Sequence, residues 1–282
     1  MRIWLCLLIA LVFLSGCISQ PAKTDIPSSA ECQKIIAELP QVIADNTKEG
    51  SRLFYVNKTV DGDTIELEGG QRVRFLEVNT PEKGMKWYAE AKELTNMSTL
   101  DGVYLTRDVT DKDKYDRLLR YVFTKDSFVN AELVRAGFAT VFIVGNDTKY
   151  ASLMKCLEDE AKANKRGLWS AVNLYNLNLS VNFDAVGSDL ENMNGEFVTI
   201  VNTGTEAINL QNWSIKDEAT HIYTFPELEL ATNENLILYT GAGENSELNL
   251  YWNSKDPIWN NDGDTAFLFD ANGDLIVAIS FP

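Results

Sequence analysis

The sequence predicts two domains, a small β-barrel capped by helices and then an immunoglobulin-like β-sandwich, from three observations. In the first half, strand-like runs are interspersed with helix-period segments, an order typical of a barrel closed by helices. From Leu179 onward, short strand-like runs alternate with Asn, Gly and Asp turns, and no helix-period stretch appears. Residues 178–282 contain 17 acidic and two basic residues, so they carry −15 of the chain's net charge of −16.

The 282 residues suffice for two domains of ordinary size. We expect a signal peptide (1–16), a lipid-anchored tether with an N-terminal helix (17–50), a barrel domain (51–170) and a sandwich domain (177–282). The expected barrel strands are Leu53–Val60, Thr64–Leu67, Gln71–Val78, Val103–Arg107 and Leu118–Phe123. The expected helices are Cys32–Leu39, Trp87–Leu100, Asn130–Ala136 and Tyr150–Lys165. Seven sandwich strands are expected, at Glu196–Val201, Ile208–Leu210, Trp213–Lys216, Ile222–Phe225, Asn235–Thr240, Thr265–Asp270 and Leu275–Phe281.

The N-terminus has the features of an export signal. Arg2 supplies a positive start, and the apolar run Ile3–Leu14 is too short to span a bilayer as a mature helix. The small residues before Cys17 resemble the lipobox of prokaryotic lipoproteins, which implies cleavage before Cys17 and acylation of its thiol. An uncleaved anchor helix and ordinary secretion are the alternatives. The expected location is therefore outside the cell membrane, tethered by lipid.

Two cysteines remain once the signal peptide and the acylated cysteine are set aside. An exported protein allows Cys32 and Cys156 to form a disulfide, and two buried free thiols are the alternative.

The stretch from Asp61 to Glu82 concentrates the polar chemistry. Asp61-Gly62-Asp63-Thr64 precedes one expected strand, and Asn79-Thr80-Pro81-Glu82 follows the next. If the strands curl into a barrel, these two segments face each other. Hard oxygen ligands, a base and a cation would then meet at one point, as cleavage of a phosphodiester requires.

The absence of histidine from the first half narrows the chemistry. The single histidine, His221, lies in the sandwich domain, which excludes a histidine base or a histidine-ligated zinc from the barrel. A carboxylate base with an oxygen-ligated hard cation such as Ca²⁺ remains. Strict alternation along Gln71–Val78 puts Arg72 and Arg74 on the face of Leu76, the expected interior, without choosing between the two arginines.

Five blocks of the first domain resemble the staphylococcal nuclease (thermonuclease) family. They are Asp61–Thr64, Val73–Glu82, Asp113–Arg117, Asn130–Gly137 and Gly167–Trp169, in the family's order and spacing. The resemblance implies a five-stranded OB-fold barrel with three helices. It also implies cleavage of DNA and RNA that leaves a 3′-phosphate.

The resemblance also implies residue roles. Glu82 corresponds to the general base, and Arg74 and Arg117 to the two guanidiniums that bind the phosphate and stabilise its developing charge. Asp63, Asn79 and the Thr80 carbonyl correspond to the Ca²⁺ site, and Lys114 and Tyr115 to positions near a terminal phosphate of bound nucleotide.

The sequence departs from the family at two functional positions. Asn79 stands where the best-known member has aspartate, so we expect weaker metal binding. The aromatic residue that stacks on a bound base is replaced by Ile143, with Tyr150 a possible substitute. Because Arg74, Glu82 and Arg117 are all present, catalysis is favoured over an inactive module that binds nucleic acid or protein, or over a surface adhesion module with a vestigial barrel.

The second half resembles the lamin tail domain through Asn194–Asn202, Leu210–Trp213, Tyr223–Pro226, Tyr239–Gly241 and Trp259–Thr265. A second Asp-Gly-Asp-Thr, at Asp262–Thr265, is interpreted as a turn that enters a strand, because no arginine accompanies it. We expect Trp213, Trp252 and Trp259 to pack in the sandwich. The module is expected to bind or localise, and the sequence does not identify its ligand.

Overall fold

The computed structural model describes residues 27–219 and 221–281. The predicted signal peptide and the predicted lipidation site, Cys17, lie outside these residues. Within them, every helix is too short or too polar to cross a bilayer.

Two helices precede the barrel, where the sequence predicted one, Cys32–Leu39. The first, α1 (Ser29–Ala37), starts with a capping box in which Ser28 and Glu31 satisfy each other's main-chain N–H groups. The second, α2 (Leu39–Thr47), carries Pro40 in its first turn, where the missing N–H costs nothing. The proline therefore begins a helix. Cys32 of α1 is disulfide-bonded to Cys156 of α5 (Ala151–Ala163), so the N-terminal helices are tied to the barrel domain.

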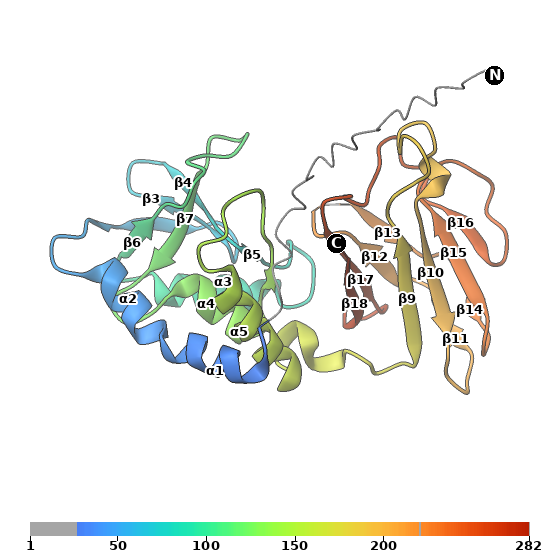
Figure 1. Ribbon diagram of the computed structural model, residues 1–282, viewed down its shortest axis with the longest axis horizontal. Helices are drawn as coiled ribbons and strands as arrows, with labels where there is room; N and C mark the ends of the chain where they lie inside the picture. The colour runs from blue at the N-terminus through green and yellow to red at the C-terminus, as the bar shows by residue number, and fades with distance from the viewer. Residues whose placement is uncertain (1–26, 220, 282) are drawn as a thin grey trace, which may run out of the picture.

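The barrel domain is an OB-fold built on a six-stranded sheet in the order β1-β6-β7-β4-β3-β2 (Figure 1). Its strands are β1 (Leu53–Phe54), β2 (Val56–Thr59), β3 (Thr64–Leu67), β4 (Arg72–Phe75), β6 (Val103–Thr106) and β7 (Leu118–Phe123). Strands β4 and β7 run parallel, with Val73 opposite Leu118. A separate pair joins β5 (Val78–Asn79) to β8 (Thr140–Val141).

Three helices cover the sheet, as predicted: α3 (Tyr88–Ser98), α4 (Val129–Arg135) and α5, followed by the 3₁₀ turn η1 (Gly167–Ala171). They enclose an aromatic and aliphatic core in which Phe75, Phe123, Phe128 and Leu133 are buried. Burial of side chains of this size, at about 25 cal/mol per Å² of apolar surface, is what holds the sheet and helices together.

The expected strand Gln71–Val78 is wrong beyond Phe75. β4 ends at Phe75, and Glu77 adopts a left-handed conformation with φ of 60° before β5 begins. Consequently Val73 and Phe75 are buried, whereas Arg72 is exposed and Arg74 is half-buried. Within β4 the arginines alternate with Val73 and Phe75, so they face away from the core. The break at Glu77 then lets Leu76 and Val78 be buried out of phase with β4.

The sandwich domain has two four-stranded sheets, β16-β15-β10-β9 and β13-β12-β17-β18, with a small pair, β11-β14. Its elements are β9 (Leu177–Asn182), η2 (Met193–Gly195), β10 (Phe197–Asn202), β11 (Ile208–Asn209), β12 (Ser214–Lys216), β13 (Ile222–Thr224), β14 (Glu229–Leu230), β15 (Asn235–Tyr239), β16 (Asn249–Tyr251), β17 (Asp264–Phe269) and β18 (Leu275–Phe281). Trp213 and Trp259 are buried in its core, and Trp252 packs against that core. This is the predicted all-β, immunoglobulin-like architecture.

The two domains pack against each other through an apolar cluster that is separate from either domain core. Leu168 and Trp169 of η1 pack with Phe267, Phe269 and Leu275 of the sandwich. An ion pair between Lys86 and Asp274 crosses the same interface. The sheet that faces the barrel is therefore β13-β12-β17-β18 (Figure 1).

Candidate active site

The Asp61–Thr64 segment forms a tight turn between β2 and β3. The main-chain N–H of Asp63 donates to Asp61 Oδ1 at 3.2 Å, which fixes an Asx turn. Gly62 is required here, because a Cβ at this position would lie 2.8 Å from the Ala91 Cβ and from two Thr80 side-chain atoms. The turn therefore fits closely against Thr80, the segment that the sequence analysis expected to face it.

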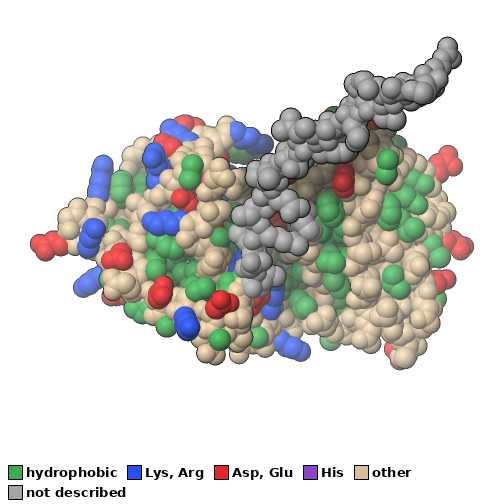
Figure 2. All heavy atoms as spheres, in the orientation of Figure 1, with side chains coloured by type: hydrophobic (Ala, Val, Ile, Leu, Met, Phe, Trp, Pro, Cys, Tyr) green, Lys and Arg blue, Asp and Glu red, His purple; other side chains and the backbone are tan. Residues whose placement is uncertain are grey.

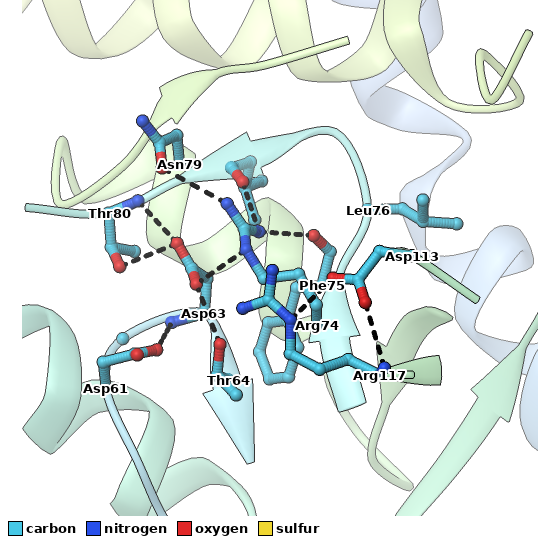
Figure 3. A network of polar contacts seen from close by, with 12 residues as sticks. Asp61, Asp63, Thr64, Arg74, Phe75, Leu76, Asn79, Thr80, Asp113 and Arg117 are labelled. Carbon is cyan, nitrogen blue, oxygen red and sulfur yellow. Dashed lines mark hydrogen bonds and ion pairs between the residues drawn. The ribbon is translucent and has the colours of Figure 1, made fainter. Parts of the chain in front are cut away.

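The Asp63 carboxylate is the centre of this contact. Its Oδ2 accepts hydrogen bonds from the main-chain N–H of Thr80 at 2.7 Å and from the Thr80 hydroxyl at 2.9 Å (Figure 3). Its Oδ1 lies 3.1 Å from Nε of Arg74. Asp63 is 5% exposed, so these partners replace water around a buried charge.

Arg74 is held rigidly by the chain that surrounds it. Nη1 donates to the main-chain oxygens of Phe75 at 2.6 Å and Val78 at 2.7 Å, and Nη2 donates to Asn79 Oδ1 at 3.2 Å (Figure 3). Within residues 27–219 and 221–281, the second N–H of Nη2 has no partner and can donate to a ligand. The break after β4 provides these carbonyls, so the left-handed Glu77 indirectly orients the arginine. The acid that pairs with Arg74 is Asp63, next to the start of β3.

Arg117 enters the site from the start of β7, next to β4 in the parallel pairing. Its Nε donates to Asp113 Oδ2 at 2.6 Å, and its main-chain N–H donates to Asp113 Oδ1 at 3.0 Å (Figure 3). Among the described residues, Nη1 and Nη2 have no hydrogen-bond partner. Four N–H groups of a planar fork are therefore free to bind a phosphate.

The predicted nucleotide contacts lie beside Arg117. Tyr115 is 69% exposed, with the Lys114 ammonium 5.2 Å from its ring centroid and the Arg117 guanidinium at 5.5 Å. A groove runs between this loop and the Gly69-Gly70 turn, lined by Arg72, Tyr115 and Arg117. An exposed aromatic ring between two cations suits a nucleotide, because the base can stack on the ring and the phosphate can bind the cations.

Glu82 follows Pro81 and is exposed. Its carboxylate forms no ion pair among residues 27–219 and 221–281, which leaves it able to accept a proton. Tyr150, the possible base-stacking residue, instead packs against Tyr121, Phe123 and Phe128. Its aromatic face is therefore used in the core, which is a correction to the sequence analysis.

The oxygens around Asp63 suit a hard cation. Burial and the nearby negative charge of Asp63 raise the pKa of Asp61 to about 6. The positive charges around the two carboxylates therefore do not fully balance their negative charges. Asn79 and Thr80, whose N–H and hydroxyl contact Asp63, contribute an amide oxygen and a carbonyl as neutral hard donors. Within the described residues, no group of three or more His, Cys, Asp and Glu side chains is arranged to hold a metal. Neutral oxygens must therefore complete any coordination.

Asn79 has an orientation that the sequence did not indicate. Its Oδ1 accepts from Arg74, and its Nδ2 donates at 2.9 Å to the main-chain oxygen of Glu218 in the sandwich domain. A second residue of that domain, Lys216, lines a small cavity together with Asn79 and Thr80. Only the folded interface could reveal these neighbours, because 139 residues separate Asn79 from Glu218.

Glu77 is a further buried acid near the site. The hydroxyl of Tyr121 contacts both Glu77 Oε1 and, at 2.9 Å, Asp108 Oδ2, and the Tyr150 N–H donates to Glu77 at 2.9 Å. Burial raises the pKa of Glu77 to about 7, against the opposing effect of these hydrogen bonds.

The charge of the surface differs between the domains. On the face in Figure 2, Lys and Arg side chains gather over the barrel domain, and the sandwich domain displays acidic side chains at its edge. The second Asp-Gly-Asp-Thr contains Asp264, the first residue of β17, whose carboxylate accepts from the N–H groups of Glu218 and Asn260. Asp262–Thr265 therefore forms a turn that enters a strand, as predicted.

Comparison with known proteins yields two family matches. Residues 72–171 match the family described as Staphylococcal nuclease homologue, and residues 175–282 match the Lamin Tail Domain. The endonuclease YncB of Bacillus subtilis is 35% identical over 130 residues, which cover 41% of this chain and 60% of that protein. The thermonuclease of Staphylococcus intermedius is 33% identical over 130 residues, which cover 41% of this chain and 75% of that protein. An uncharacterized endonuclease of Escherichia coli is 33% identical over 119 residues, with 41% and 75% covered.

Proposed function

Because this chain belongs to the staphylococcal nuclease family and continues into a lamin tail domain, we propose that it hydrolyses phosphodiester bonds of DNA and RNA. The observation that carries the proposal is the parallel pairing of β4 with β7, which places Arg74 and the open fork of Arg117 on the same face of two neighbouring strands. The aligned region spans 60% of the Bacillus protein, so the activity of the whole chain is itself part of the proposal.

The two arginines have different tasks. Arg74, with a single free N–H, provides a fixed positive charge, because four contacts to the chain hold its guanidinium. Arg117 provides the binding fork, because its Nη groups face no protein acceptor among the described residues. Charge that accumulates on the phosphate oxygens in the transition state is stabilised by donors already in position, a contribution of about 2.7–4 kcal/mol per donor in other enzymes.

Glu82 is the general base in this scheme. Its exposed carboxylate takes a proton from water, and the water oxygen attacks phosphorus. The bond from phosphorus to the 5′ oxygen breaks, the phosphate stays on the 3′ side, and the leaving oxygen takes a proton from solvent.

The Asp63 carboxylate, the Asn79 amide oxygen and the Thr80 carbonyl would hold Ca²⁺ as the cofactor of this proposal, with Asp61 close to Asp63. When bound, it would neutralise charge on the phosphate. The Asn79 oxygen already accepts from Arg74 and brings no negative charge, so we expect this chain to bind the ion weakly.

The location is also a proposal. The Leu14-Ser15-Gly16-Cys17 sequence supports export and lipid attachment at Cys17, which would place both domains outside the cell membrane. Metabolic labelling with a fatty acid tests this, since a Cys17→Ser variant should lose the label.

Cleavage of single-stranded DNA and RNA in Ca²⁺ or in chelator tests the activity. We expect Glu82→Gln and Arg117→Lys each to lower kcat/KM by at least about 100-fold, as loss of one preorganised catalytic group does. Glu93→Gln is the matched control, because Glu93 is an exposed acid of α3. Cleavage by all three variants at the wild-type rate, or none by the wild type in Ca²⁺, would overturn the assignment. Binding without cleavage would favour the inactive binding module.

A further inference from the structure

Lys216 is the last residue of β12 in the sandwich domain, yet it lies at the candidate active site. It lines the same small cavity as Asn79 and Thr80 of the barrel domain. The hydrogen bond from Asn79 Nδ2 to the Glu218 main-chain oxygen fixes the chain two residues beyond Lys216 against the site. The lysine therefore has a defined position relative to the residues that surround Asp63.

The burial of Lys216 is costly and has no matching ion pair. The residue is 7% exposed, and its Nζ forms no hydrogen bond and no ion pair within 4.0 Å among the described residues. Its nearest described aromatic contact is the Phe267 ring, whose centroid lies 5.9 Å from Nζ. Nζ is not among the fully buried polar atoms without a partner, so the ammonium keeps some contact with solvent while its stem is buried, and a ligand can reach it.

The charges that act on Lys216 include acids of the other domain. Burial lowers its pKa, and the nearby carboxylates of Asp217, Glu82, Glu218 and Asp63 oppose that effect. Two of these, Glu82 and Asp63, are the predicted base and the predicted metal ligand. The ammonium is thus within electrostatic range of the place where the phosphodiester would lie.

On this basis we propose that Lys216 is a substrate-binding residue of the barrel-domain site, supplied by the lamin tail domain to hold a phosphate of single-stranded nucleic acid. The inference rests on the proposed nuclease function and adds a partner to Arg74 and Arg117. It gives the second domain a role in the reaction. That domain is strongly acidic, and Lys216 is one of only two basic residues in residues 178–282. The other, Lys255, is exposed.

The experiment measures binding separately from cleavage. A Glu82→Gln full-length protein is titrated with a short fluorescent single-stranded DNA in Ca²⁺ at several salt concentrations. We expect Lys216→Met to raise Kd by about 10-fold or more, as loss of a charge-assisted contact does. The slope of log affinity against log salt should fall by about 0.7, the value for one phosphate contact to a single strand.

Three controls make the result specific. Lys216→Arg keeps the charge and should keep the salt slope, and Lys255→Met should change neither quantity. Lys216→Met should not lower thermal stability, because methionine keeps the buried apolar stem and the lost charge forms no ion pair within 4.0 Å among the described residues. Reduced stability with an unchanged salt slope would assign Lys216 to the domain interface alone.

The outcomes separate the two proposals. If Lys216→Met binds with the affinity and salt slope of its parent, or if the parent does not bind the DNA, the role of Lys216 is wrong. If binding depends on Lys216 but the wild-type protein does not cleave in Ca²⁺, only the nuclease function is wrong. Higher affinity for Lys216→Met would show instead that the lamin tail domain blocks the site.

Discussion

The side-chain amide of Asn79 donates to the main-chain oxygen of Glu218 at 2.9 Å, and so joins the candidate active site to the second domain. Aspartate has no N–H with which to form this bond, and its carboxylate would face a carbonyl oxygen. Asparagine at this position therefore fits the two-domain arrangement.

We predict that Asn79→Asp destabilises the full chain by about 1–3 kcal/mol, the cost of leaving a partly buried polar group without its partner. Denaturant unfolding of wild type and variant measures the difference. Asn209→Asp is the matched control, because Asn209 is exposed and only accepts through its oxygen, from Gln211 N–H. Equal stability of Asn79→Asp and wild type would show that the contact with Glu218 contributes nothing.

The fold could be predicted from the sequence where local chemistry decides it. Turn residues and strand-like runs indicated both domains, and the Asp61–Thr64 turn does face Thr80. Prediction was wrong where a single residue overrode a pattern. Glu77 adopts φ of 60°, which ends β4 early, so the buried Leu76 and Val78 do not indicate the face of β4 on which Arg74 lies.

The site was less predictable than the fold. The resemblance indicated which residues to inspect, but it did not indicate that Arg74 bridges Asp63 and Asn79. The neighbours Lys216 and Glu218 come from another domain, and no periodicity or spacing in the sequence encodes a contact of that kind. Such contacts depend on how the surfaces of the two folded domains pack together, here through Trp169 and Phe267.

Asp113 is predicted to position Arg117. Its Oδ2 accepts from Nε at 2.6 Å, and its Oδ1 accepts from two main-chain N–H groups. In Asp113→Asn the new amide would direct an N–H at Nε, so the guanidinium loses its orientation. We expect kcat/KM to fall by about 10- to 100-fold, since displacement of a catalytic group by about 1 Å has effects of that order.

Asp116→Asn serves as the control for this variant. Asp116 lies in the same loop, is exposed and pairs only with Lys112, and asparagine tolerates its φ of 65°. If Asp113→Asn and Asp116→Asn lower kcat/KM equally, Asp113 does not orient Arg117.

The Cys32–Cys156 disulfide joins α1 to α5 across 124 residues. We predict that replacing both cysteines with serine lowers the free energy of unfolding by about 2–4 kcal/mol, because the cross-link restricts the unfolded chain. Urea unfolding with and without reductant measures this. Reductant should lower the stability of the wild type to that of the variant and leave the variant unchanged. A wild type indifferent to reductant would contradict the prediction.

Glu77 gives the protein a pH dependence of stability. The Tyr121 hydroxyl contacts two carboxylates, those of Glu77 and Asp108, but has one hydrogen to donate. A proton on Glu77 supplies the second donor, so that both carboxyl groups can hydrogen-bond to Tyr121. The pKa of Glu77 is raised from 4.5 to about 7 by burial, so between these values the folded protein holds a proton that the unfolded chain has lost. Stability therefore falls as pH rises from about 4.5 to about 7, by up to about 3 kcal/mol.

Glu77→Gln should remove this part of the pH dependence, because an amide does not titrate and still donates an N–H within the network. Free energies of unfolding at pH 5, 6, 7 and 8 measure the slope for wild type and variant. Glu68→Gln, at an exposed position of the same domain, should keep the wild-type slope. Since the other titrating groups are common to all three proteins, the difference between the Glu77→Gln and wild-type curves isolates Glu77. Parallel curves would mean that Glu77 is ionised in the folded protein throughout this range.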